Sequence, residues 1–144
     1  MNKLLLILTL FLISCDNELA SENVPEVVKK GLADQFPDVR ILEWEAVDQF
    51  YIAEFNINNI PYEVKLNRDG KIMMYKYDIM ESELPQAVRA TISKEYSEVP
   101  IANTEILHHK GNKYYQVAFD GESRDYWLVF SKDGQRLDQP EYMK

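Results

Sequence analysis

Few residues in this chain are of the types that carry out chemistry. The two histidines are adjacent, His108 and His109, and the single cysteine is Cys15. Neighbouring residues on a strand point to opposite faces, so two adjacent imidazoles chelate one metal ion poorly. With so few of these residues, Ser-His-Asp and Cys-His catalysis are hard to assemble. We therefore expect exposed histidines before a turn, and no metal site.

Carboxylates are more numerous, but their pattern is not that of an active site. A predicted hairpin sets Glu54 opposite Glu63, and such a like-charged pair can raise one pKa and so mimic a general acid. Solvent weakens that effect on an exposed sheet face. The Asp-Gly pairs at 69–70 and 133–134 are short turns without the ligand series of a calcium loop. The sequence predicts neither an enzyme nor a bound cofactor.

The N-terminus indicates export. Lys3 precedes an apolar run, residues 4–13, which is too short to cross a bilayer and fits a signal peptide spanning residues 1–14. Residues 12–15, Leu-Ile-Ser-Cys, resemble a bacterial lipobox, which would make Cys15 the lipid-bearing first residue of the mature chain. Acyl chains would hold it at a membrane of the cell envelope. The alternative is a plain signal peptide with a coincidental cysteine.

The charge of the chain excludes some partners. The net charge is −8, and removal of residues 1–14 takes away one lysine to leave −9. Nucleic acids and anionic lipid headgroups favour basic surfaces, so neither is expected as a partner. Residues 15–23 are mostly polar and acidic and are interpreted as a tether. The mature chain has no second cysteine for a disulfide, so packing alone must stabilise it.

The remaining sequence contains one pattern twice. Residues 24–39 align with 84–99 at an offset of 60, each as an amphipathic helix with a proline in its first turn. The offset then becomes 64 for a series of aromatic and Asp-Gly positions: Tyr51, Phe55, Tyr62, Asp69 and Gly70 match Tyr115, Phe119, Tyr126, Asp133 and Gly134. The pattern predicts an α+β fold made of two helix-meander repeats, 24–80 and 81–144, forming one compact domain.

The strand register follows from the turn residues. Asn58 and Asn59 tolerate the positive φ angles of a tight hairpin, which pairs Phe55 with Tyr62 and places one apolar set on one face. The helices are expected to cover this face of the sheet or sheets. The opposite face then includes exposed apolar residues, the candidate protein-binding residues: Trp127, Tyr114 and Val129, followed by Ile52 and Met74.

These motifs resemble those of the PepSY-like, β-lactamase-inhibitor-protein-like family of bacterial envelope proteins. The resemblance rests on Pro25 and Pro85 and on the repeated aromatic and Asp-Gly positions, and it covers residues 24–140. It implies a tandem α/β-meander with one sheet face used for protein contact. Inhibitor proteins of this kind are stapled by disulfides, which this chain cannot form, and that difference argues against β-lactamase inhibition itself.

The sequence thus favours an exported, lipid-anchored module that binds an envelope protein or peptide through an open sheet face. An inhibitor-like role is one form of this function. Two alternatives stay open. The first is a structural module of an envelope assembly without inhibitory activity. The second is a small-molecule or metal sensor that uses acidic residues on the sheet.

Overall fold

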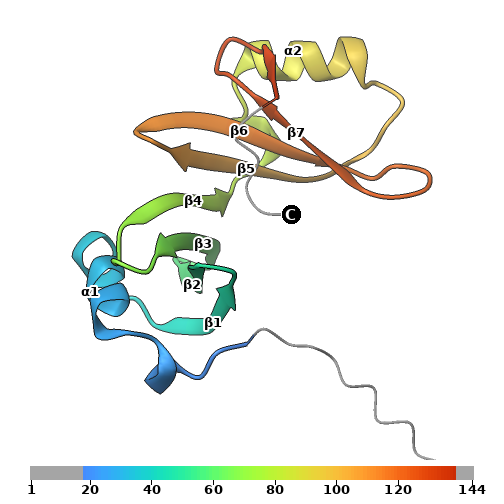
Figure 1. Cartoon of the computed structure of the whole chain (residues 1–144). Coiled ribbons are helices and arrows are strands. Elements are labelled where there is room, and N and C mark those ends of the chain that lie inside the picture. The colour runs from blue at the N-terminus through green and yellow to red at the C-terminus, as the bar shows by residue number, and fades with distance from the viewer. Residues whose placement is uncertain (1–17, 139–144) are drawn as a thin grey trace, which may run out of the picture.

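Over residues 18–138 the chain folds as an α+β protein with two α-helices and one eight-stranded antiparallel sheet (Figure 1). The computed structural model describes residues 18–138, so the predicted signal peptide and Cys15 lie outside the described residues. The strands follow chain order from β1 to β8 across the sheet. Their bounds are β1 Ile41–Val47, β2 Phe50–Ile57, β3 Ile60–Asn67, β4 Ile72–Asp78, β5 Ile101–His109, β6 Asn112–Phe119, β7 Tyr126–Phe130 and β8 Arg136–Leu137.

Each helix begins directly after the proline that the sequence placed in its first turn. Helix α1 is Glu26–Gln35 and follows Pro25, and α2 is Gln86–Glu95 and follows Pro85. A 3₁₀ turn precedes each helix, η1 at Ser21–Asn23 and η2 at Glu81–Glu83. Both helices bury two aliphatic residues at i and i+4: Val28 and Leu32 in α1, and Val88 and Ile92 in α2. These residues lie on one helix face and pack against the sheet.

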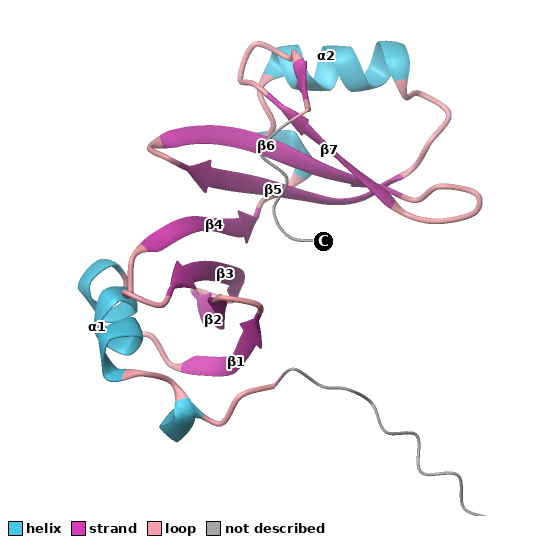
Figure 2. Cartoon of the chain, in the orientation of Figure 1, coloured by secondary structure: helices cyan, strands magenta, loops and turns pink. Residues whose placement is uncertain are grey.

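Residues 18–138 contain two apolar cores. Figure 2 shows α1 beside the strands of the N-terminal half and α2 beside those of the C-terminal half. The first lies between α1 and the strands of the N-terminal half and contains Phe55, Val64 and Leu66. The second lies between α2 and the strands of the C-terminal half and contains Phe119 and Phe130. Strands β4 and β5 join the halves through pairs running from Met74–His109 to Asp78–Glu105. One continuous sheet therefore supports both cores.

The predicted hairpin register is confirmed. Strands β2 and β3 pair Phe55 with Tyr62 and Ile57 with Ile60, and the turn residues Asn58 and Asn59 have φ angles of 52° and 65°. Strand β4 differs from the expected alternation because the β3–β4 register shifts next to Leu66. The shift places Ile72 against the first core, whereas strict alternation had placed it on the opposite face.

The segment expected to be a tether is docked on the sheet from Glu18 onward. Glu18 forms an antiparallel bridge with Glu45, and the Leu19 N–H donates to the Trp44 carbonyl at 2.6 Å. The Leu19 side chain also packs against the first core. An apolar residue within a polar stretch thus attaches this segment to the edge of β1. Within residues 18–138, no helix is long and apolar enough to span a membrane.

Gly70 sets the approach of α1 to the β3–β4 turn. Its φ is +77°, and a Cβ added there would overlap the carbonyl oxygen of Val27 in α1. Gly111, in the β5–β6 turn, has the same φ of +77° but nothing within 4 Å of its added Cβ. Comparing the same substitution at the two positions separates the free-energy cost of the positive φ angle from the free-energy cost of the contact with α1.

We predict that Gly70→Ala destabilises the protein by about 1–3 kcal/mol more than Gly111→Ala, because only the first substitution also forces α1 away from the turn. The free energy of unfolding in urea, measured for both variants and the native protein, tests this. Equal losses in the two variants would show that α1 tolerates displacement from the turn.

Candidate functional site

The strand register defines a sheet face that carries neither core. Residues directly opposite one another on antiparallel strands share a face. One row on this face runs Glu54, Glu63, Lys76, Leu107 and Tyr114 across β2 to β6. The next row runs Asp78, Glu105, Gln116, Val129 and Leu137 across β4 to β8. We call this surface the helix-free face, because the buried residues of α1 and α2 pack against the opposite side.

Of the predicted binding residues, Trp127 is the most exposed. It lies opposite Ala118 on the helix-free face, and 57% of its surface is accessible. Tyr114 and Met74 are half-buried on the same face. The structure does not bring these three into one patch by strand pairing: Trp127 is on β7, Tyr114 on β6 and Met74 on β4.

Ile52 and Val129 require a correction, because they are only 2% and 3% exposed. Neither offers surface to a partner in this conformation. Lys65 lies opposite Ile52, and its Nζ lies over the ring of Phe50, 4.5 Å from the ring centroid. Val129 lies between Gln116 on β6 and Leu137 on β8. Alternation assigned both residues to the correct face but could not show their burial.

A charged network occupies the middle of the helix-free face. The Lys76 ammonium lies 3.2 Å from a Glu63 carboxylate oxygen and 2.9 Å from one of Glu105. The Gln116 amide donates to the other Glu105 oxygen at 2.8 Å. The side chains of Lys76, Glu63 and Glu105 are only 19%, 21% and 8% exposed, so these charges are largely withdrawn from water. The four residues come from β3, β4, β5 and β6 and therefore span the junction of the two halves.

Burial and charge act in opposite directions on this network. Burial raises the pKa of Glu63, and the nearby Lys76 only partly offsets this, while Glu54 and Glu105 raise it further. Burial lowers the pKa of Lys76, but Glu63 and Glu105 together outweigh burial and raise it. The ammonium is therefore held in its charged form by two carboxylates. Such a partly buried network costs desolvation energy and gives positional specificity.

Alternation along β3, β4 and β6 is enough to place Glu63, Lys76 and Gln116 on the side away from the core, but it does not show their mutual contacts. Lys76 meets Glu105 only because β4 pairs with β5, and no turn signal connects these strands, which α2 separates in the chain. Alternation along β5 could have shown the direction of Glu105. It could not have shown which strand lay beside it.

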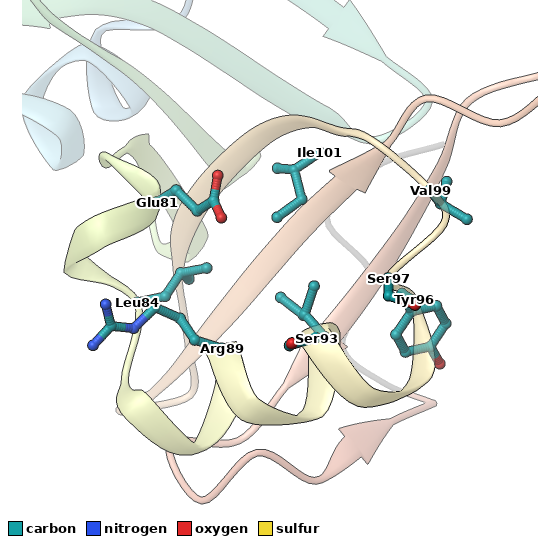
Figure 3. A pocket seen from close by; sticks show the side chains of 9 residues that line it. Glu81, Leu84, Arg89, Ser93, Tyr96, Ser97, Val99 and Ile101 are labelled. Carbon is teal, nitrogen blue, oxygen red and sulfur yellow. The ribbon is translucent and has the colours of Figure 1, made fainter.

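The surface also has a cleft beneath each helix. The cleft beneath α2 has a volume of about 340 Å³, and Figure 3 shows Glu81 and Ile101 on one side and Ser93 on the helix. The cleft beneath α1 measures about 170 Å³ and is bordered by Trp44, which is 4% exposed. Neither cleft brings together groups for acid-base or nucleophilic chemistry.

The histidines point to opposite sides of β5, as adjacent strand residues do. The His108 ring stacks on Tyr75, with 4.4 Å between centroids, whereas His109 lies opposite Met74 on the helix-free face. Across residues 18–138, no group of three or more His, Cys, Asp or Glu side chains is placed to hold a metal ion.

We predict that Lys76→Met destabilises the protein at neutral pH by about 2–3 kcal/mol, since it leaves Glu63 and Glu105 charged, close together and partly buried. Without the ammonium, burial and the nearby carboxylates should raise the native-state pKa of Glu63 further above that of the unfolded chain. The native state then binds more protons, so the loss should shrink as the pH falls from about 7 to about 5. Urea unfolding at both pH values measures this.

The control is Lys94→Met, because Lys94 is an exposed lysine on α2. This substitution should change stability little at either pH. If Lys76→Met lowers the free energy of unfolding equally at both pH values, repulsion between the carboxylates is not the cause of the loss.

Comparison with known proteins agrees with this architecture. A structure from Bacteroides eggerthii, described as a putative periplasmic protein, superposes with a TM-score of 0.73 at 21% identity, covering 81% of this chain and 88% of that one. A BLIP-like protein from Bacteroides fragilis superposes with a TM-score of 0.67 at 19% identity, covering 78% and 82%. At such identities the likeness establishes the fold. No curated protein matches the chain.

A family description matches most of the sequence, at residues 13–74 and again at 49–138. It describes proteins that are inhibitor-like and does not define an enzyme family. The chain belongs to the family described as "Putative beta-lactamase-inhibitor-like, PepSY-like".

Proposed function

We propose that this protein is a lipid-anchored binding module of the bacterial envelope, which engages another protein through its helix-free face. The observation that carries the proposal is the exposure of Trp127, since 57% of a large aromatic side chain faces solvent on a sheet face that no core requires. Tryptophan is enriched among the residues that dominate binding energy at protein interfaces. Half-buried Tyr114 and Met74 extend the apolar contribution on the same face.

The charged network supports the same use of this face. Lys76, Glu63 and Glu105 hold three adjacent strands in fixed relation, so the face is preorganised and loses little entropy when a partner binds. Its carboxylates outnumber its ammonium groups in the row Glu54, Glu63 and Lys76. A partner with a basic or hydrogen-bond-donating surface would complement this row, with an apolar pocket for the indole.

We further infer that the two halves are copies of one helix-meander unit whose helices lie on one side of the sheet. The Leu19 N–H donates to Trp44 at 2.6 Å, and the Ile79 N–H donates to Thr104 at 3.0 Å, both at the offset of 60 residues. Gly134 also lies against the Ala87 carbonyl of α2 as Gly70 lies against α1. Duplication of the unit would account for a sheet of eight strands with one face left for a partner.

The lipid anchor rests on Cys15 and the lipobox before it. The described chain begins close to that position, at Glu18, on the edge of β1. Acylation at Cys15 would therefore hold the domain within a few residues of the membrane surface. Incorporation of a labelled fatty acid into the native protein, and its loss in Cys15→Ser, would test this part of the proposal.

We predict that Trp127→Ala weakens partner binding by more than about 1 kcal/mol without unfolding the domain. Native protein, Trp127→Ala and Val27→Ala are each crosslinked to envelope proteins of the native cell, and the captured proteins are identified by mass spectrometry. The dissociation constant of the captured partner is then measured for all three. Val27 is the control because it is 49% exposed on α1, away from the helix-free face.

A partner retained by Val27→Ala and lost by folded Trp127→Ala would support the proposal. If both variants capture the same proteins as the native chain, Trp127 is not a contact residue, and a purely structural role becomes the better interpretation. Inhibition is tested separately, by assaying any captured enzyme with and without the domain.

A further inference from the structure

A basic cleft opens where the sheet divides between its two halves. Met74 and His109 form the last pair between β4 and β5. Beyond it, β4 continues back to the turn at Lys71, while β5 turns into β6 at Lys110 and Gly111. The separation leaves a cleft of about 540 Å³, closed on one side by the end of α1 at Gln35. In Figure 1 the start of β4 lies beside α1, below the β5–β6 hairpin.

The charge of this cleft is opposite to that of the whole protein. Its ionisable lining groups are Lys71, Lys110, His108, His109 and the Tyr75 phenol, and no carboxylate from residues 18–138 lines it. The chain as a whole carries a net charge of −8. Both lysines are exposed, in turns on either side of the opening. An anion at this position would meet two ammonium groups from opposite walls.

The charged groups that shift the pKa values of the two histidines are also positive. Burial lowers the pKa of His108, and the charge of Lys113 lowers it further. Burial also lowers the pKa of His109, with a contribution from Lys110. No acidic group contributes to either change. The imidazoles are therefore neutral hydrogen-bonding groups near neutral pH, and a bound anion would raise the pKa of each.

The floor of the cleft is apolar. Met73 and Met74 line it, together with the Tyr75 ring that stacks on His108 with an interplanar angle of 8°. Methionine side chains adapt their shape to apolar ligands and make favourable contacts with aromatic rings. Met73 lies where the β3–β4 register shifts, between the paired positions Ile72 and Met74. A bulge of this kind bends the strand and increases its local twist.

We propose that this cleft binds a small amphipathic anion, a carboxylate or a phosphate ester. Its charged group lies between Lys71 and Lys110, and its apolar part packs on Met73, Met74 and Tyr75. Charge-assisted hydrogen bonds from the lysines supply recognition of the anion. Burial of the apolar part supplies further affinity. The site is separate from Trp127, so it would operate whether or not the helix-free face binds a protein.

The two histidines make the test direct, since they are the only ones in the chain and both line the cleft. Their imidazole proton signals are followed by NMR while the purified protein is titrated with hexanoate, hexyl phosphate, inorganic phosphate, 1-hexanol or hexylammonium. We expect saturable shifts and raised histidine pKa values with hexanoate or hexyl phosphate. The affinity should fall as salt is raised to about 0.5 M.

The variants assign the binding to this cleft. Lys71→Gln/Lys110→Gln should weaken the affinity about tenfold or more. Lys94→Gln/Lys132→Gln removes the same charge from exposed positions on α2 and in the β7–β8 turn, and should bind within about twofold of the native protein. All four lysines are exposed, and circular dichroism checks that both variants are folded.

Four results would overturn the proposal. The first is that neither hexanoate nor hexyl phosphate binds, and the second is that the two double variants lose affinity equally. The third is equal affinity for 1-hexanol and hexanoate, and the fourth is equal affinity for inorganic phosphate and hexyl phosphate. The third result would exclude recognition of the charge, and the fourth would exclude the contribution of the apolar floor.

Discussion

The pairing of β4 with β5 is the interaction on which the rest of the structure depends. Each helix and its strands form a separate core, and no helix spans the two. The backbone ladder from Met74–His109 to Asp78–Glu105 converts two small layers into one eight-stranded sheet. Lys76, Glu63 and Glu105 then reinforce this junction from the helix-free face. Without the ladder, neither the charged network nor the basic cleft would exist.

The two sides of the sheet therefore have different physical roles. One side carries the aliphatic and aromatic residues that α1 and α2 cover, and its composition is explained by packing. The other combines buried apolar residues, a partly desolvated ion network and one highly exposed tryptophan. That combination is costly for a surface whose only requirement is solubility. It is the basis of the proposal that this face contacts a partner.

The basic cleft shows how a junction between halves creates a site that neither half contains. Lys71 and Met73 come from the N-terminal half, whereas His108 and Lys110 come from the C-terminal half. Gly111 in the β5–β6 turn and Met73 at the register shift in β4 also line the cleft. An acidic protein thus acquires a local positive potential through the position of two turns. A site of this kind would couple ligand binding to the geometry of the junction.

The sequence by itself determined the local structure. Prolines at the helix starts, the paired asparagines of the β2–β3 turn and the alternation of aromatic residues predicted the helices, the hairpin register and the face of most strand residues, because these signals act over a few residues. The tertiary structure decided what lies further apart: the contact of Lys76 with Glu105, the burial of Ile52 and Val129, and the approach of Lys71 to Lys110. These depend on which strands become neighbours across α2 and on where a bulge shifts the register, and neither is encoded in residue spacing along a single strand.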